Sequence, residues 1–264
     1  MPLKHINPFV IFAHARSGSS ALYEIMCWNK RPILFEPFNT EHYQYKNLIE
    51  NYQHENLIKY HQYENIIEYH QYKNAIELKI FKNIISEIFS KSYGIKHLFN
   101  QLTEDKNKFL IEKFPCIFLY RKDITSAALS FELSIKTKIW TSEGVNFEEN
   151  YIEDIKNDKG DLFFLIDPES LQETINSYSE EVKLYRKNIK NGYVIEYENL
   201  FGPDGFDYVK EIMNFLNIKI TNEKKTIEIL RPIRKLNKKP WEEVITNWEE
   251  ISKIIEVNKN KIKL

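Results

Sequence analysis

The chain has 264 residues, and its 37 basic and 38 acidic side chains leave a net charge of −1. A protein that coats nucleic acid usually needs a strongly basic domain, so this balance argues against a nucleic-acid partner. The two cysteines, Cys27 and Cys116, have no metal-ligand spacing, which favours a reduced, cytoplasmic setting.

The first predicted element is a buried strand over Phe9–Ala13, an apolar run that ends at His14. It is too short to span a membrane and lacks the flanks of a secretory signal, so we expect neither a span nor a leader. A helix is predicted over Ser19–Trp28. The intervening loop has a glycine turn, a helix N-terminus and the planar cation of Arg16, which together predict a site for phosphate or sulfate. An ordinary capping turn is the alternative.

A second short strand, Pro32–Phe35, is followed by Glu36 and Pro37. We expect this strand to lie beside the first loop in a parallel sheet, which would bring Glu36 to the same edge. Because a proline disfavours the helical region for the residue before it, Pro37 predicts an extended backbone at Glu36.

A nine-residue repeat occupies residues 44–79. Its glutamines and its asparagines each recur at intervals of nine, at Gln44, Gln53, Gln62 and Gln71 and at Asn47, Asn56, Asn65 and Asn74. Nine residues are about 2.5 helical turns, so equivalent positions would fall on opposite faces of a helix. This pattern predicts a surface excursion produced by tandem duplication, and a lid or an acceptor-binding arm is the alternative. The histidines His54, His61 and His70 have no stable metal-ligand spacing.

The remaining predicted elements alternate between strands and helices. In chain order they are a helix over Ile76–Ile88, a strand over Cys116–Tyr120, helices over Ile124–Thr137 and Leu171–Ile189, a strand over Tyr193–Ile195, a helix over Tyr208–Leu216 and a C-terminal helix from Trp241 to Ile262. Alternation of this kind is typical of a parallel sheet covered by helices on both faces. We therefore expect a single α/β domain over 1–264, a three-layer, P-loop-like fold in which the repeat is a helical or irregular insertion.

The first loop differs from the nucleotide P-loop GxxxxGK[ST] at two positions. Ala13 stands at the position of the first glycine, and Ser19 replaces the lysine that would reach the β- and γ-phosphates. A kinase or ATPase is therefore a weaker interpretation.

Three segments carry a resemblance to a known family. Residues 9–22, FVIFAHARSGSSAL, resemble the 5′-phosphosulfate loop of the sulfotransferases that use 3′-phosphoadenosine-5′-phosphosulfate (PAPS), usually written PRSGSTLL or PKSGTTWL. Residues 116–140 are similar to the family segment that binds the 3′-phosphate, and residues 192–218 are similar to its strand–YEDL–helix–FLGI block. The nine-residue spacing from Arg121 to Ser130 and the later TKIW are closest to the bacterial trehalose sulfotransferase branch.

The resemblance implies a role for each matching residue. The 5′ end of the donor would be bound by Arg16, Ser17, Gly18, Ser19 and Ser20. Arg121 and Ser130 would hold the 3′-phosphate, and Tyr197 would contact the adenine. The alternatives are a surface ion pair of Arg121 with Asp123 and a helix-buried hydroxyl at Ser130. A late basic stretch would close over the phosphates or form a solvated turn: Arg231, Arg234, Lys235, Lys238 and Lys239.

The implied activity is transfer of the sulfuryl group of PAPS to a hydroxyl of a small acceptor, a carbohydrate or glycolipid precursor, with adenosine 3′,5′-bisphosphate as the product. Glu36 matches the proposed base of the trehalose branch, and the alternative is a strand-end charge that only positions the sugar. No metal is expected, since the transferred group carries less charge than a phosphoryl group. The same branch suggests a homodimer. A P-loop kinase and an inactive nucleotide-binding module remain the competing hypotheses.

Overall fold

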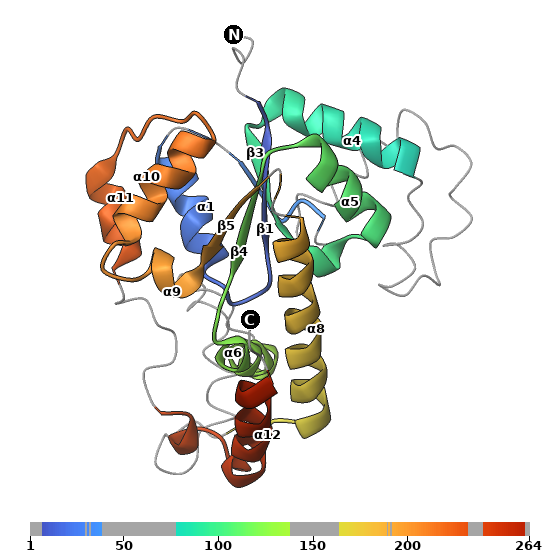
Figure 1. The fold of residues 1–264 in the computed structure, drawn as a ribbon, viewed down its shortest axis with the longest axis vertical. Coiled ribbons are helices and arrows are strands. Elements are labelled where there is room, and N and C mark those ends of the chain that lie inside the picture. The colour runs from blue at the N-terminus through green and yellow to red at the C-terminus, as the bar shows by residue number, and fades with distance from the viewer. Residues whose placement is uncertain are drawn as a thin grey trace.

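The computed structural model describes residues 7–29, 31, 33–38, 78–137, 164–188, 190, 192–231 and 240–261. A sheet of five parallel strands, in the order β2-β3-β1-β4-β5, forms its centre (Figure 1). The strands are β1 (Phe9–Ala13), β2 (Leu34–Phe35), β3 (Gly94–Leu98), β4 (Cys116–Tyr120) and β5 (Gly192–Glu196). β1 is thus the middle strand and pairs with β3 on one side and β4 on the other.

Helices cover both faces of this sheet and extend past one edge of it. The described helices are α1 (Ser19–Trp28), α4 (Leu78–Lys91), α5 (Glu104–Lys113), α6 (Ile124–Thr137), α8 (Pro168–Lys187), α9 (Tyr197–Leu200), α10 (Gly205–Phe215), α11 (Glu223–Leu230) and α12 (Trp248–Lys261), with 3₁₀ turns at Phe99–Gln101 and Trp241–Glu243. In Figure 1, α1, α10 and α11 lie on one side of the sheet and α4 and α5 on the other. The expected three-layer α/β class is confirmed.

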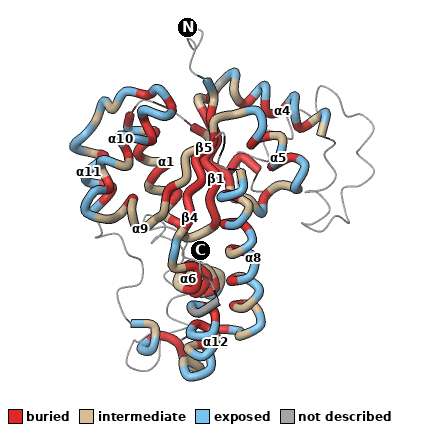
Figure 2. The backbone as a smooth tube through the Cα atoms, viewed as in Figure 1, coloured by how far each residue is buried: buried red, intermediate tan, exposed pale blue. Residues whose placement is uncertain are grey.

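The sheet separates two hydrophobic cores. Successive residues of β1 point to opposite faces, and all five are buried. Phe9, Ile11 and Ala13 pack with residues of α1, α10 and α11, whereas Val10 and Phe12 pack with residues of α4, α5 and α8. Burial on both faces explains why the central strands are continuous apolar runs, and Figure 2 shows these strands as the most buried part of the chain.

A smaller helical group extends past the carboxyl edge of the sheet. There α6, α12 and the first half of α8 pack together (Figure 1). Asp167 caps α8 by accepting a hydrogen bond from the Ser170 N–H at 3.1 Å. No helix within the described ranges is long and apolar enough to cross a membrane.

Several predicted elements are confirmed with their bounds, and others need correction. β1, β4, α1 and α6 have the predicted limits. The sequence analysis did not predict β3, α5 or α11. The predicted C-terminal helix is wrong at its start, because α12 begins only at Trp248. Residues 244–246 pair instead with Phe164, whose N–H donates to the Val244 carbonyl at 2.8 Å.

The prediction that the second strand, β2, lies directly beside the first loop is also wrong. β3 lies between β1 and β2, so Glu36 follows a strand that is two positions away from the first loop. Where β3 pairs with β1, Gly94 at the start of β3 lies close to the β1 backbone. A Cβ on Gly94 would lie 2.7 Å from the Phe9 carbonyl oxygen.

Candidate active site

The strand order changes direction at the carboxyl ends of β1 and β4. After β1 the chain runs toward β2 and β3 on one side of the sheet, and after β4 it runs toward β5 on the other. In open parallel sheets, ligands bind where adjacent strands lead in opposite directions in this way. The loops that leave β1 and β4 carry Arg16 and Arg121, the two arginines singled out in the sequence.

The loop after β1 has a strained backbone that leads directly into α1. Arg16 and Gly18 have positive φ angles of 65° and 81°. Gly18 is required for space as well as for conformation, because a Cβ there would lie 2.5 Å from a ring carbon of Phe201 and 2.9 Å from one of Tyr197. Within the described residues no side chain caps the N-terminus of α1. The first N–H groups of the helix are therefore left for an anion.

Arg16 connects the loop to α6. Its Nε donates a hydrogen bond to Ser130 Oγ at 3.0 Å, which joins two of the predicted donor-binding residues over 114 positions of sequence. Burial lowers the pKa of the Arg16 guanidinium from its usual value. An arginine still remains charged at neutral pH, so the loop holds a partly desolvated cation. Ser17, fully buried, donates from Oγ to the His14 carbonyl at 2.7 Å and so closes the turn.

Arg121 occupies the corresponding place at the end of β4. Its guanidinium lies over the ring of Tyr197 at 5.0 Å from the ring centre, which brings together two further predicted residues. The alternative partner, Asp123, instead caps α6 by accepting from the Ser126 N–H at 3.0 Å. The Nε of Arg121 is buried and has no hydrogen-bond partner among the described residues. A half-buried cation whose Nε donor has no partner among these residues is suited to an anionic ligand.

His14 links the two loops. Its Nε2 accepts a hydrogen bond from the Arg121 backbone N–H at 3.0 Å, so the proton of the neutral ring is on Nδ1, which donates to the Ala15 carbonyl at 2.8 Å. Burial lowers the pKa of His14 to about 4. Both ring nitrogens are therefore engaged at neutral pH, and His14 is a structural link between the loops.

Glu36 lies in a separate buried network at the end of β2. One carboxylate oxygen pairs with the Lys96 ammonium, and the other accepts from Gln101 Nε2 at 2.7 Å. The predicted extended backbone at Glu36 is wrong, because its φ is 45°. The Glu36 N–H continues the ladder to the Lys96 carbonyl at 2.8 Å, and the side chain then turns back to the Lys96 ammonium. A positive φ at a residue other than glycine costs about 1–3 kcal/mol and is often found at functional sites.

The structure therefore brings most of the predicted residues into two groups. Tyr197 adjoins both Gly18 and Arg121, and Arg16 contacts Ser130, whereas Glu36 belongs to the β2–β3 network. Of the late basic stretch, Arg231 ends α11, and the other four residues lie outside the described residues, as does the repeat before Leu78. The sequence analysis missed Lys96 and Gln101, although a lysine in the apolar run of residues 94–98 is a signal that could have indicated a buried ion pair.

The chemistry of these groups suits a ligand with two separate anionic ends. Two arginines, an uncapped helix N-terminus and a glycine without space for a side chain all lie at the carboxyl ends of β1 and β4. In the part of the chain that the structure describes, no group of three or more His, Cys, Asp or Glu side chains is placed to hold a metal ion.

Comparison with known proteins gives one kind of match. No family model matches the chain, and no curated protein matches it. Among solved structures, it is similar to the sulfotransferase STF9 from Mycobacterium avium, with a TM-score of 0.47 and 11% sequence identity. That match covers 98% of this chain and 77% of the other.

Proposed function

We propose that this protein transfers the sulfuryl group of PAPS to a hydroxyl of a small acceptor, a carbohydrate or glycolipid precursor. The observation that carries the proposal is the pairing of two half-buried arginines through His14 at the carboxyl ends of β1 and β4. PAPS carries a phosphosulfate at its 5′ end and a phosphate at its 3′ position, so it needs two such sites one nucleoside apart.

The residues of the first loop bind the 5′ end of the donor in this proposal. The Arg16 guanidinium and the N–H groups at the start of α1 stabilise its oxygens, and the hydroxyls of Ser19 and Ser20 contribute further polar contacts. Ser17 supports the site by holding the turn, since its hydroxyl proton is bound by the His14 carbonyl. Gly18 allows the backbone to approach closely.

Arg121 binds the 3′-phosphate, and the donor is its Nε, which has no hydrogen-bond partner among the described residues. Ser130 holds the 3′-phosphate together with Arg121 in this proposal. Because its oxygen accepts from Arg16, its own hydroxyl proton remains available for a phosphate oxygen. Tyr197, held between Arg121 and Phe201, borders the adenine.

The reaction exchanges one S–O bond for another. The acceptor oxygen forms a bond to sulfur, and its proton passes to the carboxylate of Glu36. The bond from sulfur to the 5′-phosphate oxygen breaks, and its electron pair stays on that oxygen as adenosine 3′,5′-bisphosphate leaves. Arg16 and the N–H groups of α1 stabilise the charge that develops there, so catalysis rests on positioning and electrostatics.

Lys96 and Gln101 give Glu36 a fixed direction in this mechanism. A base must be within hydrogen-bond reach of the proton that it removes, and a carboxylate held at both oxygens cannot rotate away. Oε2, held by a neutral amide, is the better proton acceptor, because Oε1 faces the Lys96 ammonium.

Calorimetric titration with adenosine 3′,5′-bisphosphate and with ATP tests the proposal. We expect tight binding of the bisphosphate without added metal. Magnesium-dependent binding of ATP alone would indicate a P-loop kinase. Binding of the bisphosphate together with no turnover of PAPS, in a broad screen of hydroxylated acceptors, would indicate an inactive nucleotide-binding module.

Arg121→Ala tests the 3′-phosphate site. Loss of a charge-assisted hydrogen bond costs about 1.5–3 kcal/mol, so bisphosphate affinity should fall by roughly 10- to 100-fold. Adenosine 5′-phosphate has no 3′-phosphate and serves as the control ligand, and its affinity should change little. Equal losses for both ligands would refute this role of Arg121.

A further inference from the structure

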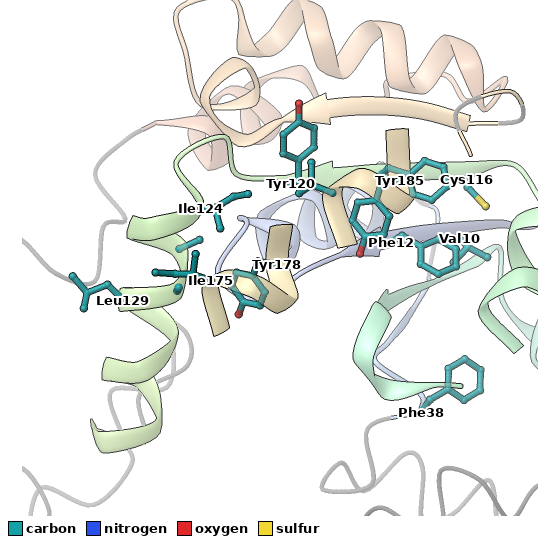
Figure 3. Close-up of a cluster of buried hydrophobic side chains, with 14 of the residues drawn as sticks. Val10, Phe12, Phe38, Cys116, Tyr120, Ile124, Leu129, Ile175, Tyr178 and Tyr185 are labelled. Atoms are coloured by element: carbon teal, nitrogen blue, oxygen red, sulfur yellow. The ribbon is translucent and has the colours of Figure 1, made fainter. Parts of the chain in front are cut away.

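Tyr178, a buried tyrosine of α8, lies against the candidate site and has a hydroxyl group with an unusual lack of hydrogen bonds among the described residues. Tyr178 is 5% exposed, and its hydroxyl is buried without a hydrogen-bond partner among the described residues. Buried tyrosine hydroxyls normally have a partner, and leaving one unpaired costs about 1–3 kcal/mol. Tyr185, two turns later on the same helix, is also buried, but its hydroxyl donates to Glu181 at 3.5 Å. Both rings turn from α8 into the same core (Figure 3).

The contacts of Tyr178 lead to both arginine sites. Its ring stacks on His14 with 4.4 Å between ring centres and 24° between planes. His14 accepts the backbone N–H of Arg121. On the other side, the ring packs edge-on against Phe131 at 6.0 Å, and Phe131 follows Ser130, the partner of Arg16. Tyr178 is thus fixed between the loop after β1 and the helix after β4.

The hydroxyl of Tyr178 is a donor at every physiological pH. Burial raises its pKa well above the usual value, although the nearby positive charge of Arg16 acts in the opposite direction. A neutral O–H group next to a guanidinium is suited to an anionic oxygen, which accepts from both. We explain a buried donor that has no partner among the described residues by a partner in the ligand.

We propose that Tyr178 is a donor-binding residue, whose hydroxyl donates a hydrogen bond to an oxygen at the 5′ end of the nucleotide held by Arg16. This inference rests on the proposed function. Stacking on His14 gives the phenol a fixed position, so α8 contributes a third element to the site, in addition to the loop after β1 and the start of α6.

Tyr178→Phe tests the inference, since it removes only the hydroxyl and keeps the ring on His14. Tyr185→Phe is the matched control, because it makes the same change in the same helix away from the loops. Calorimetric titration would use adenosine 3′,5′-bisphosphate and adenosine 3′-phosphate, which lacks the 5′ group. We expect Tyr178→Phe to weaken bisphosphate binding by roughly tenfold or more and to leave the affinity for adenosine 3′-phosphate unchanged. Tyr185→Phe should alter neither affinity.

The outcomes separate this inference from the function on which it rests. If the wild-type protein does not bind the bisphosphate, the proposed function fails and the inference fails with it. If the wild type binds it and Tyr178→Phe binds it equally well, or loses affinity for both ligands alike, the role of Tyr178 is refuted while the function stands.

Thermal unfolding of the ligand-free protein adds a second readout. Removal of an unpaired buried hydroxyl should leave the Tm of Tyr178→Phe unchanged or higher. A variant that unfolds or has a clearly lower Tm would show that the hydroxyl stabilises the fold, and this result would also overturn the proposal.

Discussion

Acidification should destabilise this protein well before its carboxylates titrate, because two histidines are buried in the neutral form. Burial lowers the pKa values of both His14 and His97 to about 4. In the unfolded chain each has a pKa near 6.5, so protons bind preferentially to the unfolded state below that pH. The contribution of the two neutral histidines to the free energy of unfolding is complete above about pH 6.5 and is lost progressively as the pH falls toward 4.

The size of the loss follows from these two pKa values. At pH 5.5 each histidine lowers the free energy of unfolding by about 1.4 kcal/mol relative to pH 7.5, so the pair lowers it by about 3 kcal/mol. A domain of ordinary stability has only about 5–15 kcal/mol in total. At pH 5.5 carboxylates with ordinary pKa values are still largely ionised, which isolates the histidines.

Urea unfolding at pH 7.5 and pH 5.5, followed by tryptophan fluorescence and circular dichroism, measures this difference. The His97→Gln variant keeps an N–H donor for Asn107, which the His97 ring contacts at 2.8 Å, and removes one of the two titrations. The decrease in the free energy of unfolding of this variant from pH 7.5 to pH 5.5 should be about half that of the wild type. Equal stability of the wild type at both pH values would refute the reasoning, as would an undiminished loss in the variant.

Three further predictions concern the site. Glu36→Gln should reduce turnover by about 10²-fold while bisphosphate affinity stays unchanged, and full activity in steady-state assays would exclude Glu36 as the base. Lys96→Met should lower the free energy of unfolding by about 3–5 kcal/mol, because it leaves the buried Glu36 carboxylate without its ion-pair partner. The double variant Lys96→Met, Glu36→Gln should recover most of that free energy in urea titrations, and additive losses would contradict the pairing. Gly18→Ala should abolish bisphosphate binding in calorimetry, since its Cβ would overlap Phe201 and Tyr197, and retained affinity would show that α9 can move away.

The parts of the fold that the sequence predicted well are those with local signals. Phe9–Ala13 and Cys116–Tyr120 are apolar runs buried on both faces, and the loop before α1 contains its own glycine and helix start. β3 was missed because Lys96 and His97 interrupt its apolar pattern. Both are buried through partners that are not adjacent in sequence, Glu36 at the end of β2 and Asn107 in α5.

The same distinction applies to the candidate site. Each arginine could be found from the strand and helix around it, but the contact of Arg16 with Ser130 spans 114 residues and depends on how α6 packs. Tyr178 gave no signal at all, since a tyrosine on the apolar stripe of a long helix is usually a core residue. Its stacking on His14, and a buried hydroxyl with no partner in the described part of the chain, exist only in the folded chain.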